Sequence, residues 1–194
     1  MPGEIKIDDG SGNYTILTNA GSLGSDKTIT IPNETATLAT TSGTDFSCQQ
    51  FRLTANITAS ADPITGFEVP DTLMQGNFGN NVTESSGIFS FTKTGFYKVS
   101  YISVIHTAST GTDGSIFIQG TNDNSSYSNL ANATIRINDN DDGDVLICTT
   151  VLDITDLTNQ KVKFTFNEST GSLIMLGNST YNRTYVEFMR LGDT

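Results

Sequence analysis

The sequence predicts an all-β protein built as a two-layer sandwich. Thr, Ser, Asn and Gly are abundant while Lys, Arg and Leu are scarce, which suits short strands joined by turns and suits helices poorly. From residue 51 onward, apolar alternation recurs at intervals typical of a sandwich. In residues 96–107 the alternation gives way to apolar residues on both faces, so this strand needs a second sheet or a neighbouring subunit to cover it.

The N-terminal segment contains four short alternating pieces with two apolar residues each. They are Ile5/Ile7, Tyr14/Ile16, Ile29/Ile31 and Ala36/Leu38. Two apolar residues per piece are too few for an independent core. We therefore expect residues 1–46 to form a β-rich docking or intertwining arm that other copies or another protein complete, and residues 47–194 to form the main domain.

In the main domain, turn residues separate ten expected strands. These are residues 51–59, 66–70, 88–93, 96–107, 115–120, 130–137, 145–153, 161–166, 172–176 and 184–191. The clearest is 161–166, where Val162, Phe164 and Phe166 share one face. Residues 87–108 are expected to form a hairpin that turns at residues 93–95.

Two of these strands carry a family resemblance. Gly95-Phe96-Tyr97 followed by an alternating strand is similar to the central signature of the tumour-necrosis-factor-like and complement globular-head jelly rolls, and the aromatic-rich strand 184–191 is similar to the last strand of that family. Members of the family form compact trimers. The resemblance implies a TNF-like jelly-roll homotrimer, and we expect aromatic contacts at its three-fold axis. The residues expected there are Tyr97, Tyr101, Phe164 and Tyr185.

A second resemblance lies in the arm. Residues 27–39, Lys-Thr-Ile-Thr-Ile-Pro-Asn-Glu-Thr-Ala-Thr-Leu-Ala, resemble a recurrent element of tailed-bacteriophage structural proteins that typically precedes a distal fibre or spike domain. This implies a virion protein, made in the host cytoplasm, whose arm binds the capsid or another virion structural protein.

Capsid decoration, as a head fibre, is the preferred role because the chain is short and begins at Met, whereas a tail fibre usually carries a long shaft. The alternative is a tail-fibre adhesin that recognises a host-surface glycan. A third interpretation, a secreted cytokine-like ligand, is disfavoured because the N-terminus lacks the charged and apolar regions of a signal peptide.

Composition argues against several other classes. The net charge is -11, and the ten Lys and Arg residues are scattered singly, so nucleic acid is not an expected partner. No apolar run approaches the roughly 20 residues of a membrane span, so no membrane association is expected. Cys48 and Cys148 lack metal-type spacing, and we expect them not to form a disulfide because the protein is expected to be cytosolic.

Catalysis finds no motif in the sequence. The single histidine, His106, ends the most apolar strand and has no Ser or Cys in a recognisable nucleophile setting, so we expect a buried structural residue. The glycine-rich segments lack the Lys and the strand-to-helix context of a phosphate-binding loop. We therefore expect no enzymatic activity and no organic cofactor.

One acidic segment is a candidate calcium site. Residues 138–144, Asn-Asp-Asn-Asp-Asp-Gly-Asp, place oxygen donors at alternate positions around a turn glycine, an arrangement that can wrap Ca²⁺. The candidate ligands are Asn138, Asn140, Asp142 and Asp144. The segment lacks the later acidic ligand of an EF-hand, and a solvated turn explains the same residues.

A second polar loop, residues 119–129, is a candidate glycan site. Amides and hydroxyls surround a single aromatic ring, so a sugar can form hydrogen bonds with the loop and stack on the ring. The candidate residues are Asn122, Asp123, Asn124 and Tyr127. The alternative is an ordinary exposed loop without a ligand.

Overall fold

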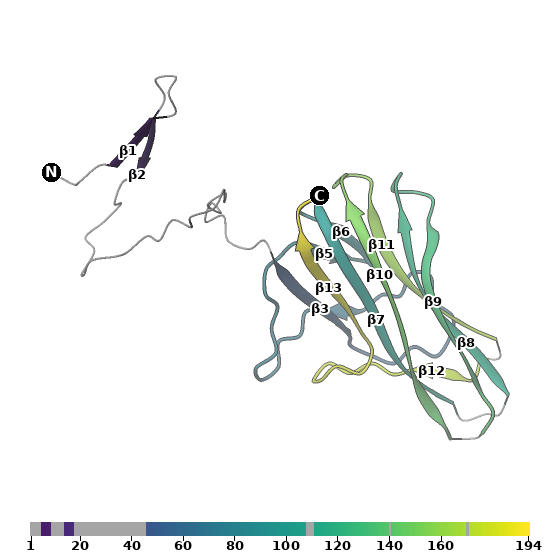
Figure 1. Cartoon of the computed structure of the whole chain (residues 1–194). Helices are drawn as coiled ribbons and strands as arrows, with labels where there is room; N and C mark the ends of the chain where they lie inside the picture. Colours follow the sequence, from purple (N-terminus) through teal and green to yellow (C-terminus); the bar gives the residue numbers. More distant parts are fainter. Residues whose placement is uncertain (1–4, 9–13, 18–45, 108–110, 140, 170) are drawn as a thin grey trace. The chain divides into compact units, whose positions relative to one another are not determined.

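The computed structural model describes residues 5–8, 14–17, 46–107, 111–139, 141–169 and 171–194. The chain divides into two compact units, Met1–Thr40 and Thr41–Thr194. In the first unit, β1 (Ile5–Asp8) and β2 (Tyr14–Leu17) form an antiparallel pair in which Ile5 lies opposite Leu17 (Figure 1). The strands expected around residues 29–31 and 36–38 lie outside the described residues.

The second unit contains two antiparallel sheets, whose strands are labelled in Figure 1. The six-stranded sheet has the order β10-β7-β13-β3-β4, with β12 pairing to β7. Its strands are β3 (Ser47–Leu53), β4 (Phe67–Glu68), β7 (Gly95–Thr107), β10 (Gly143–Ile154), β12 (Leu173–Met175) and β13 (Tyr185–Gly192). The described residues contain no helix, which confirms the predicted all-β class.

The five-stranded sheet has the order β5-β6-β11-β8-β9. Its strands are β5 (Val82–Ser85), β6 (Ile88–Phe91), β8 (Thr112–Thr121), β9 (Ser128–Ile137) and β11 (Lys161–Glu168). In β11 the predicted alternation is confirmed, because Val162, Phe164 and Phe166 are all buried. Phe164 pairs with Ile118 of β8 across the sheet, so matching apolar residues fix the register of these two strands.

Aromatic rings from both sheets meet in the core. Phe164 of β11 lies near the centre of this cluster, with ring centroids 5.1 Å from Phe89 and 5.2 Å from Tyr101. Phe188 of β13 stacks on Phe89 at 5.2 Å, and Phe51 of β3 meets the same ring edge-on. Such pairs add about 0.5–1.5 kcal/mol each beyond the burial of their area. The cluster therefore holds the two sheets together.

A buried arginine closes one end of the six-stranded sheet. Arg190 is fully buried, and its Nε and Nη2 donate hydrogen bonds of 3.0 and 2.8 Å to the carbonyl oxygen of Thr94, while Nη2 also pairs with Asp193. Gly95 follows with φ of 137°, and a Cβ at this position would collide with the Gly192 carbonyl and the Arg190 guanidinium. This close approach explains why glycine opens β7.

The predicted hairpin over residues 87–108 is wrong. β6 pairs with β5 and β11, whereas β7 pairs with β10, β12 and β13 in the other sheet. Each strand has an apolar face, and these faces oppose each other across the core, where the rings of Phe91 and Tyr97 are 4.8 Å apart. Residues 92–94 therefore carry the chain from one sheet to the other.

Two further boundaries differ from the prediction. The strand expected at residues 51–59 ends at Leu53, because both the amide and the hydroxyl of Thr54 bond the carbonyl of Gly66 and turn the chain out of the sheet. β5 was not predicted, since Val82 is the only fully buried residue in its four positions. Its edge is held by Gln49, which forms hydrogen bonds to both the amide and the carbonyl of Val82.

Candidate functional site

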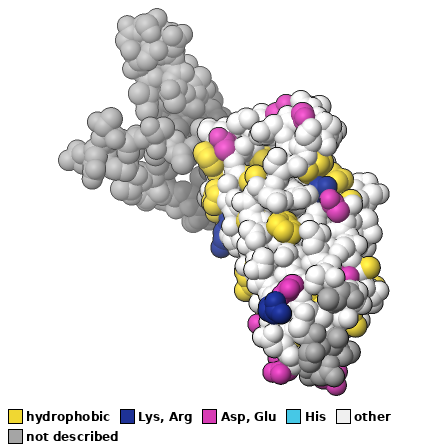
Figure 2. All heavy atoms as spheres, turned by 90° about the vertical axis from the view of Figure 1, so that its right-hand side faces the viewer, with side chains coloured by type: hydrophobic (Ala, Val, Ile, Leu, Met, Phe, Trp, Pro, Cys, Tyr) yellow, Lys and Arg dark blue, Asp and Glu magenta, His cyan; other side chains and the backbone are white. Residues whose placement is uncertain are grey.

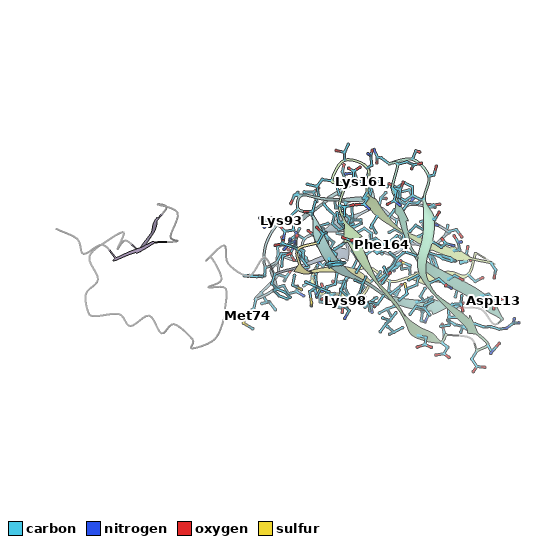
Figure 3. All side chains as sticks on the ribbon, turned by 45° about the horizontal axis from the view of Figure 1, so that its top comes forward. Met74, Lys93, Lys98, Asp113, Lys161 and Phe164 are labelled. Carbon is cyan, nitrogen blue, oxygen red and sulfur yellow. The ribbon has the colours of Figure 1, made fainter. Side chains whose placement is uncertain are left out.

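A groove of about 540 Å³ opens at one end of the sandwich, near the residue labelled Lys161 in Figure 3. The turn after β8, the end of β10 and the start of β11 form its walls. Leu130 and Val151, both exposed, supply an aliphatic surface. The polar lining includes Asn122, Asp123, Asp153, Gln160 and Lys161.

The turn after β8 is ordered by one carboxylate. Oδ1 of Asp123 accepts hydrogen bonds from the amides of Ser126 (2.7 Å) and Ser125 (2.9 Å) and from the hydroxyl of Thr121 (2.7 Å). The pKa of Asp123 is lowered well below its usual range, first by the amide of Ser126 and then by the Thr121 hydroxyl. Asp123 is therefore ionised at neutral pH and fixes the turn from within.

The opposite wall is ordered in the same way. Asp156 accepts hydrogen bonds from the side chain and the amide of Asn159 and from the amide of Thr158, and these bonds lower its pKa. Gln160 then links the walls, because its Nε2 donates to Oδ1 of Asn122 at 3.0 Å while its Oε1 accepts from the amide of Asp156. The groove is thus held open by its own hydrogen bonds.

The structure separates the four predicted glycan-binding residues. Asn122 and Asp123 line the groove, whereas Asn124 and Tyr127 do not. Nζ of Lys163 lies 4.7 Å from the centroid of the Tyr127 ring, so a cation already covers one face of the predicted stacking platform. Partial burial, and then the charge of Asp123, raise the pKa of Tyr127. Val151 and Gln160 were not predicted, because they join the groove only through the fold.

The groove suits a neutral polar ligand. Asp123 and Asp153 disfavour an anion, while amide and hydroxyl groups beside the aliphatic rim of Leu130 and Val151 can bind a hydroxylated molecule. The lining contains neither histidine nor cysteine, the commonest bases and nucleophiles of acyl-transfer sites.

The predicted calcium ligands lie in the connection between β9 and β10. Asn138, Asp142 and Asp144 are exposed, and Asn140 lies outside the described residues. Oδ1 of Asp142 accepts from the amide of Gly143 at 2.8 Å, and Oδ1 of Asp144 from the amide of Val145 at 2.7 Å. In the part of the chain that the structure describes, no three His, Cys, Asp or Glu side chains gather as metal ligands. Calcium binding stays a prediction.

Three of the four predicted trimer contacts are wrong. Tyr97, Tyr101 and Phe164 are fully buried inside the protomer, where their rings fill the space between the sheets. The hydroxyl of Tyr101 contacts Met175 Sδ at 3.4 Å, and burial raises the pKa of this tyrosine well above its usual range. They cannot meet another chain without unfolding the core. Tyr185 alone lies on the outer face, and it is partly exposed.

The outer face of the six-stranded sheet carries the exposed apolar side chains that the trimer prediction lacked. On β10, Val145, Ile147 and Val151 are 49%, 60% and 59% exposed. Ile147 pairs with Ile102 of β7, which pairs on its other side with Tyr185 of β13, and Val145 pairs with Val104. We call the group Ile102, Val104, Val145, Ile147, Val151 and Tyr185 the outer apolar strip.

The sequence contained part of this signal. Apolar residues on both faces of the second half of β7 indicated a second buried surface, and Ile102 and Val104 are among them. His106 follows the same parity. It was predicted to be buried, but it lies partly exposed on the outer face, opposite Gly143 and Ile174.

No family model and no curated protein matches the sequence. Solved structures with the same fold are similar. Murine APRIL at pH 8.5 superposes with a TM-score of 0.55 at 9% identity, over 76% of this chain and 100% of that one. Eiger TNF from S. frugiperda gives a TM-score of 0.53 at 13% identity, over 77% of this chain and 94% of that one.

These comparisons confirm the predicted TNF-like jelly-roll fold of the main domain, and at such low identity they support the fold alone. Within the described part of the chain, no helix has the length and hydropathy needed to cross a membrane.

Proposed function

We propose that this protein is a non-enzymatic structural protein of a tailed-phage virion that assembles as a homotrimer. Residues 1–46 anchor it to the capsid or to another virion protein, and the jelly-roll domain projects outward as a capsid decoration or head fibre. Its place of action is the virion, after synthesis in the host cytoplasm.

The outer apolar strip carries the trimer part of this proposal. Six apolar or aromatic side chains on three neighbouring strands form a contiguous patch, and such patches mark interaction sites in soluble proteins. Complete burial of a side chain such as Ile147 is worth about 1.5–3 kcal/mol. The TNF-like fold supports the same conclusion, because the family that the sequence resembles forms compact trimers.

The arm supports the virion part. Residues 27–39 resemble a recurrent element of phage structural proteins, and the described pair β1 and β2 has four residues in each strand. An isolated two-stranded sheet of this size is marginally stable in water. An anchoring partner or further copies of the arm therefore complete it.

Light scattering on purified protein tests the assembly. We expect the native chain to be trimeric and Ile147→Asp to be mainly monomeric, because a carboxylate in the contact must be desolvated. Leu157→Asp is the matched control, since Leu157 is exposed but lies outside the outer apolar strip, and it should remain trimeric. A monomeric native chain would refute the trimer.

Cryo-electron microscopy of assembled particles tests the location. Density for the domain distributed over the head supports decoration, with the arm at the capsid surface. Density confined to the tail tip contradicts decoration and favours the second candidate.

The second candidate is a tail-fibre adhesin that recognises a host-surface glycan, and the groove beside Asn122 and Gln160 favours it. A glycan array should then give hits with neutral sugars that Asn122→Ala weakens and Asn178→Ala, which is remote from the groove, does not. An array without hits removes this candidate.

A further inference from the structure

The loop between β4 and Phe78 presents two large apolar side chains directly to solvent. Leu73 and Met74 are 97% and 101% exposed, the highest values among the large hydrophobic residues of the described chain. Met74 points away from the sandwich in Figure 3. We call this pair the apolar knob.

The loop is fixed to the sheet by a buried arginine. Arg52 of β3 is fully buried, and its guanidinium bonds Glu68 at 2.6 Å, Asp71 at 2.8 Å and the side chain of Gln75 at 3.0 Å. The amide of Gln50 also donates to Oδ1 of Asn77. These bonds hold both sides of the knob, so its solvent exposure is not the result of a free loop.

The backbone at the knob is strained. Leu73 has φ of 55°, in the left-handed region that costs a branched L-residue roughly 1–2 kcal/mol. Strain of this kind persists where the surroundings enforce it, and it concentrates at functional positions. The strain turns an apolar tip outward, which is unfavourable for an isolated protomer.

A complementary surface lies at the opposite edge of the same sheet. The strand order is β10-β7-β13-β3-β4, so the knob follows one edge while Val145 and Ile147 lie on the other. A contact between two different patches of one chain is head-to-tail, and it closes into a ring when the rotation between copies permits. Three copies related by such a contact form a closed trimer.

We propose that Leu73 and Met74 of one copy pack against Val145 and Ile147 of the next copy, so that a head-to-tail contact joins the three protomers. This inference rests on the proposed homotrimer and names the contact that forms it. Each contact pairs unbranched or branched aliphatic side chains from both sides, which gives complementary chemistry.

Charge favours a second copy as the occupant. The chain carries a net charge of -11, so two copies repel each other unless their contact is neutral. Arg52 neutralises Glu68 and Asp71 beside the knob, which lets the loop approach an acidic neighbour. The acceptor is itself uncharged at Val145 and Ile147.

Thiol cross-linking tests the contact. The background is Cys48→Ser, while Cys148 stays, because burial raises its pKa to about 11 and keeps the thiol unreactive. Leu73→Cys and Ile147→Cys are combined in one chain and treated with a short bifunctional maleimide. We expect covalently linked trimers on a denaturing gel, and only dimers when chains bearing one cysteine each are mixed.

The control combines Leu73→Cys with Leu157→Cys, an equally accessible position outside the acceptor, and it should give no linked trimers. Linking between chains that carry only Ile147→Cys indicates a two-fold contact and overturns the inference. Trimers on light scattering without linking overturn it as well but leave the proposed trimer intact. Monomers on light scattering overturn both.

Discussion

At the scale of single residues, burial separates side chains that sequence reasoning grouped together. Phe164 and Tyr185 were both expected at a trimer axis, yet Phe164 is fully buried between the sheets and Tyr185 lies partly exposed on the outer face. Their substitutions should therefore act on different quantities. Changes at Phe164 act on protomer folding, and changes at Tyr185 act on association.

Phe164→Ala should lower the free energy of unfolding by about 3–5 kcal/mol, because it removes a ring from the aromatic cluster and leaves a cavity. Urea unfolding at one fixed protein concentration measures this effect. The exposed aromatic Tyr181 provides the control, since Tyr181→Ala should shift the free energy by less than about 0.5 kcal/mol. Equal effects of the two changes would contradict the core assignment.

Asp123 should make the stability of the domain depend on acid pH. Hydrogen bonds to the carboxylate lower its folded-state pKa below the unfolded value of about 3.9. Its contribution is thus fully present above pH 3.9, and it is lost as the pH falls through the lower folded-state pKa. Acid titration followed by circular dichroism should show a shallower loss of stability in Asp123→Asn than in the native chain. Identical acid profiles would exclude this role.

At the scale of elements, side-chain hydrogen bonds decide the conformation of the loops. Asp123 and Asp156 order the two turns that border the groove, and Arg52 holds the loop between β4 and Phe78. All three act on backbone segments that form no regular strand. Loops held in this way keep a fixed shape at the surface, as a binding surface requires.

Arg52→Met should release the loop without unfolding the sandwich. Glu68 and Asp71 keep access to water, so they can be solvated when the guanidinium is removed. Hydrogen exchange should therefore accelerate in residues 69–77 and stay unchanged in β8 and β11. The control is Arg136→Met, whose partner Asp113 lies 3.6 Å away at an exposed pair, and it should change neither region. Faster exchange throughout the core would show that Arg52 supports the fold itself.

At the scale of the whole molecule, an acidic surface and an apolar strip act in opposite directions on assembly. On the face shown in Figure 2, basic side chains lie singly among acidic and uncharged ones. With a net charge of -11 per chain, copies repel over long range, while the strip and the knob attract only on contact.

Trimer assembly should therefore strengthen with sodium chloride. The Debye length falls from about 30 Å at 0.01 M to about 3 Å at 1 M, which screens the repulsion between chains and leaves apolar burial intact. Analytical ultracentrifugation across this range should show a falling dissociation constant. A rising one would mean that ion pairs hold the trimer.

The sequence alone determined the class of fold and most of its strands. Alternation in residues 161–166, the apolar second half of β7 and the turn residues between strands each depend on local chain geometry, which period-two patterns report directly. The start Gly95-Phe96-Tyr97 also indicated the TNF-like fold, because the glycine is required where β7 meets Arg190 and Gly192.

Only the tertiary structure decided which face of each strand meets the other sheet and which remains available to a partner. Tyr101 and Ile102 are adjacent and both fit the strand pattern, but one is fully buried and the other belongs to the outer apolar strip. The groove and the knob likewise join residues far apart in the chain. Their positions follow from sheet order and long-range packing, which local periodicity does not encode.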